Sequence, residues 1–416
     1  MSPDSSPLGW LMATQSRGVQ PGLQRMERLL SALGNPEKRL RCLHVAGTNG
    51  KGSVCAFSES ILRFQGVRTG LYTSPHLVDF AERIRIDGVN AATAAIDDGI
   101  LRLQEATDGW SEEEQPTFFE LVTALALDLF EREGCEIVVL ETGLGGRLDA
   151  TNTVPKLACA VTPIALDHTE WLGTTIGEIA REKAGIFRPG VPVVIAPQQR
   201  EAAEALLEKA HEVGVLCDVV TSPVPADMPL GLAGSCQRWN AALALQLVRA
   251  AGFYPSPDAL AAGLGEVSWA GRFQRVHISG GELILDGAHN LHAVRQLVTT
   301  WREEYGDRSC RLIFGALSDK DPSAMLAELL PLACEVRLVP VASARTIDPS
   351  ELAVEKCFTA CSHPVPMVHG SLREALEGLR YQDPSSEAPV LLTGSLFLVG
   401  EALSLLGGGG TTPRNQ

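Results

Sequence analysis

The chain has 416 residues, of which 45% are hydrophobic and 20% are charged, and its formal net charge is −15 at pH 7. This length predicts about two to three domains, and the composition is typical of a globular protein with sizeable cores. The acidic balance and the lack of a basic run argue against a nucleic-acid partner. No signal peptide opens the sequence, and no apolar run approaches the roughly 18 residues of a membrane span, so we expect no membrane partner.

The cysteines form no zinc or redox motif. Ten occur, and none are spaced as C-x-x-C pairs. Several stand in apolar runs, which is typical of small buried hydrophobic residues in a reducing compartment, so we expect a cytoplasmic protein. Residues 1–17 and the tail 406–416 are expected to be loose.

The first half of the chain alternates strands and helices. Amphipathic or apolar periodicity predicts helices at 23–33, 93–106, 118–133, 175–184, 240–251 and 255–265. Buried strands are predicted at 41–46, 67–73, 136–141, 157–164 and 191–196. Continuous apolar strands between helices favour a parallel α/β sheet covered on both faces.

A glycine-rich segment, HVAGTNGKGS at 44–53, follows the first buried strand and precedes an amphipathic helix. Glycines let the backbone approach phosphate oxygens, and the N–H groups that begin the helix attract the anion. Lys51 can supply charge to the outer phosphates, and Ser53 can bind Mg²⁺. The standard G-x-x-x-x-G-K-[ST] spacing is not met, because Val45 stands at its first glycine and Gly52 precedes Ser53. The alternative interpretation is a plain glycine-rich turn.

Two more strands end in groups that suit metal or phosphate. One ends at Glu141, and another leads to Asp167 and His168. Ligands of open parallel sheets bind at the carboxyl ends of the strands, so these groups are predicted to meet the glycine-rich loop at one edge. Alone, Glu141 could be a capping or surface acid and His168 a structural histidine. Together with the loop they predict an Mg-ATP site.

A second run of strands, near 282–285, 311–314, 336–341 and 390–392, predicts a smaller α/β domain. We place the boundary at Arg275, which gives domains at 18–274 and 275–405. Polar residues gather in sequence near this junction, and a mobile second domain could bring them to a bound nucleotide. They are Asn240, Arg272, Asp286 and His289. The alternative for Asp286 is a helix N-cap, and Lys183 reads as an ordinary helix lysine.

The chain resembles the folylpolyglutamate synthase and dihydrofolate synthase branch of the Mur ligases from about residue 20 to 405. The resemblance is carried by nine ordered segments: HVAGTNGKGS at 44–53, YTSPHL at 72–77, ETGLGGRLDATN at 141–152, DHTEWLG at 167–173, EKAGI at 182–186, GRFQ at 271–274, DGAHN at 286–290, GALSDKD at 315–321 and GS at 394–395. It implies a P-loop-type parallel sheet domain followed by a Rossmann-like α/β domain. Thr142 departs mildly, since members often carry Val there.

The resemblance also implies the chemistry. ATP would phosphorylate the carboxylate of a folate or dihydropteroate, and the amino group of L-glutamate would attack the resulting acyl phosphate to form an amide. ATP and Mg²⁺ are the expected cofactors, and a monomer is expected. The resemblance places the ATP phosphates on the loop, with nucleotide contacts from Gly47, Thr48, Asn49, Gly50, Lys51, Gly52, Ser53, Asn240, Arg272 and Asp286.

Further roles are implied residue by residue. Ser53 and Glu141 would hold one Mg²⁺, and His168 would hold a second together with a carbamylated Lys183. His289 would lie near the reacting phosphate, so that the implied catalytic residues are Lys51, Lys183 and His289. The folate side would be formed by Ser74, Pro75, His76, Arg83, Arg85, Phe119, Glu120 and Asp149.

Two alternatives remain at this point. A cell-wall-type Mur ligase acting on a nucleotide-sugar peptide would share the fold, but the GKGS loop and the lack of a recognisable nucleotide-sugar domain count against it. A nucleotide-dependent switch or scaffold would not require Arg272, Asp286 and His289 together with Lys183. The sequence leaves open whether the first glutamate, later glutamates or both are added.

Overall fold

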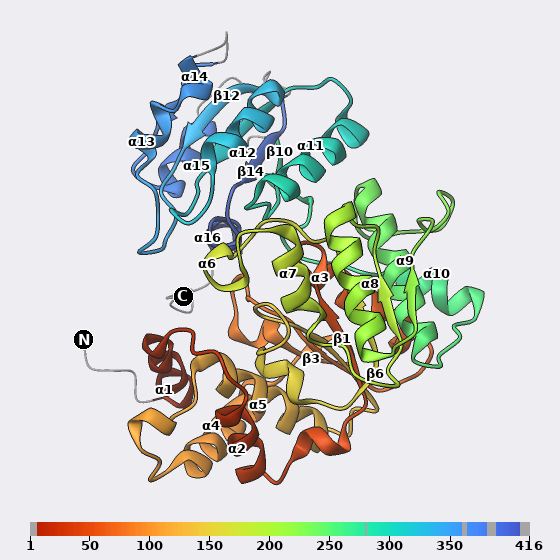
Figure 1. The fold of residues 1–416 in the computed structure, drawn as a ribbon. Helices are drawn as coiled ribbons and strands as arrows, with labels where there is room; N and C mark the ends of the chain where they lie inside the picture. The colour runs from red at the N-terminus through yellow and green to blue at the C-terminus, as the bar shows by residue number, and fades with distance from the viewer. Residues whose placement is uncertain (1–5, 279–280, 360–363, 381–387, 408–416) are drawn as a thin grey trace. The chain divides into compact units, whose positions relative to one another are not determined.

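The computed structural model describes residues 6–278, 281–359, 364–380 and 388–407 (Figure 1). The chain divides into two compact units, and each is described by itself. Unit 1 consists of Met1–His76, Ala81–Gly231 and Gln237–Val267, and unit 2 of Leu77–Phe80, Leu232–Cys236 and Ser268–Gln416. The chain enters unit 2 for the last time at Ser268, a few residues before the expected boundary at Arg275. No helix in these described ranges is both long and apolar enough to cross a membrane.

Unit 1 is built on an eight-stranded sheet with the order β4-β3-β2-β5-β1-β6-β7-β8. Its parallel strands are β2 (Thr69–Tyr72), β5 (Ile137–Glu141), β1 (Cys42–Ala46), β6 (Lys156–Val161), β7 (Val193–Ile195) and β8 (Cys217–Val219). The antiparallel strands β3 (Ile84–Ile86) and β4 (Val89–Asn90) extend one edge. They are too short for a clear period-two pattern, so the sequence does not predict them.

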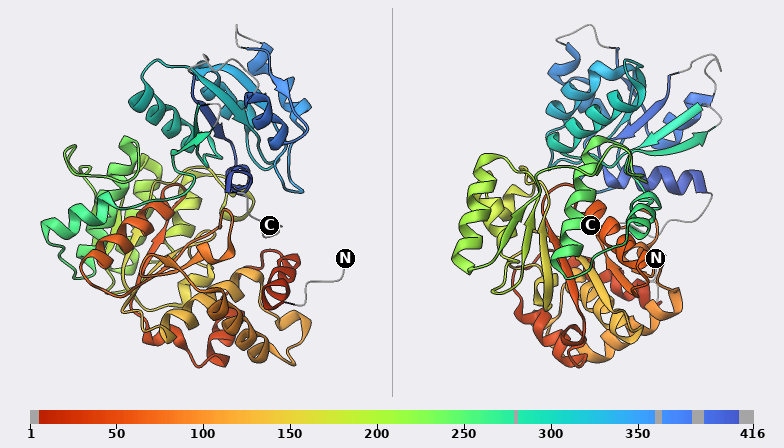
Figure 2. Two further views of the ribbon diagram at one scale, coloured as in Figure 1. Left: turned by 180° about the vertical axis from the view of Figure 1, so that it is seen from behind. Right: turned by 90° about the vertical axis from the view of Figure 1, so that its right-hand side faces the viewer.

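Helices cover both faces of this sheet, as predicted. α7 (Ile176–Ala184) and α8 (Arg200–Val213) lie on one face, and α3 (Lys51–Phe64) and α10 (Pro257–Gly265) lie on the other (Figure 2). Every residue of β1 and β5 is therefore buried, which explains their continuous apolar sequences. The remaining helices of the unit are α1 (Pro7–Ala13), α2 (Gln24–Ala32), α4 (Thr93–Thr107), α5 (Phe118–Arg132), α6 (Thr169–Leu172) and α9 (Ser235–Ala250).

The N-terminal segment is not loose, so the expectation for residues 1–17 is wrong for the part that the structure describes. Ser6 caps α1 by accepting a hydrogen bond from the Gly9 backbone N–H at 3.0 Å, and Leu11 is fully buried. A 3₁₀ helix follows at Thr14–Arg17. The α1 helix has only seven residues, PLGWLMA, and such a short run gives too weak a helical period to predict. At the other end, α16 (Leu396–Gly407) includes the start of the expected tail, and residues 408–416 lie outside the described residues.

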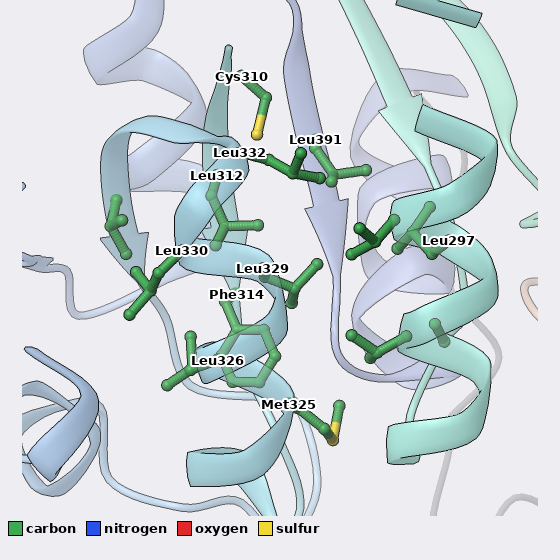
Figure 3. Close-up of a cluster of buried hydrophobic side chains, with 14 of the residues drawn as sticks. Leu297, Cys310, Leu312, Phe314, Met325, Leu326, Leu329, Leu330, Leu332 and Leu391 are labelled. Atoms are coloured by element: carbon green, nitrogen blue, oxygen red, sulfur yellow. The ribbon is translucent and has the colours of Figure 1, made fainter. Parts of the chain in front are cut away.

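Unit 2 contains a six-stranded sheet with the order β13-β12-β11-β14-β10-β9. Its strands are β9 (Gln274–Ile278), β10 (Gly281–Leu285), β11 (Cys310–Phe314), β12 (Ala333–Leu338), β13 (Met367–Val368) and β14 (Val390–Thr393), of which β9 runs antiparallel to β10. The helices besides α16 are α11 (Leu291–Tyr305), α12 (Pro322–Leu329), α13 (Pro349–Ala353), α14 (Lys356–Thr359) and α15 (Leu372–Arg380). On one face, Leu297 of α11 and Leu326 of α12 pack with Phe314 of β11 in a buried apolar cluster (Figure 3).

Candidate active site

The predicted site elements of unit 1 share one edge of the sheet. β5 and β6 are the direct neighbours of β1, and β2 lies beyond β5. Val45 pairs with Glu141, and Tyr72 pairs with Leu140. Because these strands are parallel, the loops that follow them emerge side by side. The glycine-rich loop therefore lies between the loop that follows Glu141 and the segment that leads to His168.

The glycine-rich loop is held too closely for side chains at two positions. Gly47 and Gly50 have φ values of +142° and +90°. A Cβ at Gly47 would lie 1.8 Å from the Thr162 hydroxyl oxygen, and one at Gly50 would lie 2.8 Å from the side-chain oxygen of Asn240. Only glycine tolerates this combination of conformation and crowding. The contact also places Asn240, a predicted nucleotide ligand, directly beside the loop.

Lys51 and Ser53 occupy the first turn of α3. The ammonium group of Lys51 donates to the Thr48 carbonyl oxygen at 3.1 Å, within the loop. Ser53 is 1% exposed, and its hydroxyl has no hydrogen-bond partner among the described residues. A buried hydroxyl without a partner costs free energy, so a ligand at this point would relieve that cost. The unpaired oxygen at the start of a helix suits a metal-bound phosphate group.

Glu141 ends β5 with a carboxylate that is 6% exposed. One of its oxygens accepts a hydrogen bond from the backbone N–H of Ser74 at 3.1 Å, which ties the loop after β2 to this strand end. Mg²⁺ is commonly held by one or two protein oxygens together with waters and substrate phosphates. Ser53 and Glu141 fit that donor set. No group of three or more His, Cys, Asp or Glu that could hold a metal occurs among the described residues.

Lys183 lies in the site although the sequence reads as an ordinary helix lysine. It is 4% exposed, and its ammonium nitrogen is 2.7 Å from the carbonyl oxygen of Gly47. Burial, with a contribution from the charge of Lys51, lowers the pKa of Lys183 to about 7. The nearby Asp167 acts in the opposite direction and raises this pKa. A large part of Lys183 is therefore neutral, and a neutral amine is a nucleophile.

His168 stands at the start of the short helix α6 in a left-handed conformation, with a φ of +51°. Its side chain is 47% exposed, and its backbone N–H donates to the carboxylate of Asp167 at 3.0 Å. For a bulky residue this conformation is uncommon and marks a constrained position. The structure thus places the imidazole at the surface of unit 1, in the segment that follows β6.

Arg83 and His76 are joined on the predicted folate side. Arg83 is 1% exposed, and its Nε donates to Nδ1 of His76 at 2.8 Å. The guanidinium lies 5.4 Å from the ring centre of Phe118, and one terminal nitrogen has no hydrogen-bond partner in the described part of the chain. Burial lowers the pKa of Arg83 from its ordinary value. A buried guanidinium with a spare donor is suited to an anionic group.

Phe119 packs against the loop that follows β5. Its ring atoms come within 2.4 Å of the position that a Cβ at Gly143 would occupy, and its ring centre is 6.1 Å from that of Tyr72. An aromatic face beside a carboxylate-bearing strand end suits a flat heterocycle. Ser74 and Pro75 follow β2 at the same edge, and Arg85 lies on β3.

Two predicted substrate residues, Glu120 and Asp149, also have structural partners. Glu120 closes a capping box at the start of α5, since its carboxylate accepts from the Thr117 backbone N–H at 2.7 Å, and it also pairs with Arg25 at 3.2 Å. Asp149 accepts from the backbone N–H groups of Leu144 at 2.8 Å and Thr151 at 3.0 Å. Both side chains support the walls of the site through these bonds.

Unit 2 brings three predicted residues together around a tight turn. The Asp286 carboxylate accepts hydrogen bonds from the backbone N–H groups of Phe273 and Ala288, both at 2.9 Å. Burial raises the pKa of Asp286, while the charge of Arg272 opposes this rise. His289 is held through a 2.8 Å contact between its Nδ1 and the Gly287 carbonyl oxygen.

The N-cap alternative for Asp286 is wrong. Asn290 caps α11, since its side-chain oxygen accepts from the Ala293 backbone N–H at 2.9 Å. Phe273 has a φ of +46°, a strained conformation for an aromatic residue. Its ring is buried against Trp301, and its N–H donates to Asp286. These two contacts stabilise the strained conformation of Phe273. The neighbouring Arg272 is thereby presented from a fixed turn.

Comparison with known proteins gives consistent matches. The family described as "Mur ligase, glutamate ligase domain" matches residues 271–396. The chain is 35% identical to a probable bifunctional folylpolyglutamate synthase/dihydropteroate synthase of Haloferax volcanii over 92% of its own length, but spans only 48% of that relative. It is 36% identical to the dihydrofolate synthase/folylpolyglutamate synthase of Bacillus subtilis, covering 78% of this chain and 82% of the relative.

A solved structure described as E. coli FolC in complex with DHPP and ADP is also similar. It superposes with a TM-score of 0.85 at 32% identity, and the match covers 98% of this chain and 99% of the other. The two-sheet α/β architecture predicted from the sequence is confirmed by this match. The likeness extends to a protein that was solved with a nucleotide bound.

Proposed function

The chain belongs to the folylpolyglutamate synthase and dihydrofolate synthase family, and we propose that it is an ATP-dependent ligase that joins L-glutamate to a pteroate-type carboxylate. The observation that carries the proposal is the buried unpaired hydroxyl of Ser53 beside the glycine-rich loop, one strand from Glu141. This arrangement suits a metal-bound triphosphate. The family relationship supplies the acceptor class, because the relatives carry the names of folate enzymes.

In the proposed reaction, a carboxylate oxygen of the acceptor attacks the γ-phosphorus of ATP, and ADP leaves. The amino nitrogen of glutamate then attacks the acyl carbon, loses a proton and expels phosphate. The loop N–H groups and Lys51 bind the phosphates and offset the charge that develops on them. Ser53 and Glu141 would hold Mg²⁺, which neutralises phosphate charge when bound.

On the acceptor side, the spare donor of Arg83 suits a carboxylate, and the Phe119 ring suits a flat heterocycle. We propose that His168 and a carbamylated Lys183 hold a second Mg²⁺, and the lowered pKa of Lys183, about 7, supports this role because only a neutral amine adds CO₂. Asn240, Arg272 and Asp286 are proposed to serve the nucleotide, and His289 to act near the reacting phosphate.

We propose that the protein is cytoplasmic and monomeric. The nine cysteines in the described ranges are free, and five of them are buried, which supports a reducing location. The monomer rests on the family resemblance.

The experiment measures phosphate release with ATP, Mg²⁺ and glutamate, with dihydropteroate or tetrahydrofolate as the acceptor. Turnover with both acceptors would establish both activities, and turnover with one would assign that activity alone. Protein that binds ATP and turns over neither acceptor would contradict the proposal.

A further inference from the structure

A buried series of hydrogen-bonded side chains links β1, the strand before the glycine-rich loop (the proposed phosphate loop), to the loop after Glu141. His44 is fully buried in β1, and its Nε2 lies 2.7 Å from the hydroxyl oxygen of Thr151. That hydroxyl makes a short hydrogen bond to the carboxylate of Asp149. Thr151 is fully buried and Asp149 is 5% exposed. None of the roles described above uses His44 or Thr151.

The proton positions along this chain follow from the chemistry of its members. Burial and the charges of Lys156 and Arg188 lower the pKa of His44 well below its ordinary value, so the imidazole is neutral and carries one N–H. A carboxylate only accepts, so the single hydroxyl proton of Thr151 is donated to Asp149. The hydroxyl oxygen then accepts from His44, which places the imidazole proton on Nε2. Nδ1 is left as an acceptor without a partner in the described residues.

Asp149 passes this constraint to the loop 143–147. Its second oxygen accepts from the Leu144 backbone N–H at 2.8 Å, and its first oxygen accepts from the Thr151 N–H. The far end of the loop is fixed by Asn152, whose amide donates to the Arg147 carbonyl at 2.9 Å. The loop begins two residues after Glu141 and carries Gly143, against which the Phe119 ring packs. A movement of Asp149 would therefore move the wall beside Phe119.

We propose that His44 and Thr151 are positioning residues that fix Asp149 and the loop 143–147 in the geometry that binds the pteroate-type acceptor. This inference rests on the proposed function, because it concerns the acceptor side of the same site. His44 also lies on β1, the strand that leads into the glycine-rich loop, but the backbone hydrogen bonds of Asp149 go to Leu144 and Thr151, on the acceptor side. Loss of the hydrogen bonds from His44 and Thr151 should therefore affect acceptor binding more than nucleotide binding.

The test compares Thr151→Val, which keeps the shape and loses the hydroxyl, with Thr151→Ser, which keeps the hydroxyl. We expect the Val variant to raise KM for the acceptor by about 10-fold or more, with ADP affinity within about twofold of wild type. The Ser variant should recover most of the loss. His44→Phe, which keeps a planar ring without the donor, should change KM for the acceptor in the same direction.

The matched control is Thr107→Val. Thr107 is 4% exposed in α4, and its hydroxyl donates to the Leu103 carbonyl at 2.8 Å, so this change also removes a buried hydrogen bond. It should lower the melting temperature and leave KM for the acceptor unchanged. If Thr151→Val only lowers the melting temperature in the same way, the inference is wrong. Wild-type protein without acceptor-dependent phosphate release would instead refute the proposed function, and the inference would fall with it.

Discussion

Lys183 donates a hydrogen bond from its side-chain nitrogen to the carbonyl oxygen of Gly47, at 2.7 Å. This contact joins the end of α7 to the first glycine of the phosphate loop. It brings a second amine close to Lys51, and that proximity is one cause of the lowered pKa of Lys183. The lowered pKa makes Lys183 available as a neutral nucleophile beside the glycine-rich loop.

We predict that Lys183 is carbamylated in the presence of CO₂. Its pKa of about 7 means that the neutral amine predominates only above this pH, so carbamate should increase as the pH rises from 6 to 8. Carbon-13 NMR with labelled bicarbonate would show a carbamate signal at pH 8 that weakens at pH 6. The signal should vanish in Lys183→Ala.

The matched control for the carbamate is Lys156. Burial lowers its pKa only to about 8, so less of its amine is neutral at a given pH than for Lys183, and its nitrogen contacts the Asn152 side-chain oxygen at 2.5 Å. Lys156→Ala should therefore retain the signal. A signal that disappears with Lys156 and persists without Lys183 would contradict the assignment.

Ser53→Ala should weaken the response to Mg²⁺ without loss of folding. We expect the Mg²⁺ concentration for half-maximal turnover to rise by about 10-fold or more, because one ligand oxygen is lost. Ser58→Ala is the control, since Ser58 lies on the same helix and its buried hydroxyl is likewise without a partner in the described ranges. Equal Mg²⁺ responses in the two variants would exclude Ser53 as a ligand.

Lys51→Ala should abolish turnover and leave the fold intact. The lysine offsets charge that develops in the transition state, and removal of such a group costs about 100- to 1,000-fold in kcat or more. Lys38→Ala, at an exposed lysine that binds the nearby Asn35 side chain, should retain wild-type turnover. Near-normal turnover of the Lys51 variant, measured as phosphate release, would refute the phosphate-loop assignment.

Asp286→Ala should destabilise unit 2 and also reduce turnover. It leaves the N–H groups of Phe273 and Ala288 without their acceptor, and each buried unpaired group costs about 1–3 kcal/mol. Asp286→Asn keeps one acceptor oxygen, so its stability and turnover should lie between those of wild type and Asp286→Ala. Denaturant unfolding measures the stability of wild type and of both variants. Phosphate release at a temperature where all three proteins are folded measures their turnover. Unchanged stability in the Ala variant would contradict the stabilising role of these two hydrogen bonds.

The fold could be predicted from sequence because its strands are continuous apolar runs and its helices are periodic. The phosphate loop could be predicted because glycine, lysine and serine meet in one short segment. Lys183 could be named only through the family resemblance, since its burial against Gly47 depends on how α7 packs on the sheet. The hydrogen bond from the Phe273 N–H to Asp286 depends on a positive φ at Phe273, which no local sequence pattern indicates. The partnership of His44 and Thr151 joins residues that are distant in sequence.

The most direct measurement uses an acceptor with both carboxylate oxygens labelled with ¹⁸O. If the carboxylate attacks ATP to form an acyl phosphate, one labelled oxygen must leave with the phosphate when glutamate forms the amide. The acyl-phosphate route predicts one ¹⁸O atom per phosphate released, detected by mass spectrometry, in an acceptor- and glutamate-dependent reaction. Phosphate without label, formed at the same rate as the amide, would contradict the acyl-phosphate route and with it the proposed roles of the site.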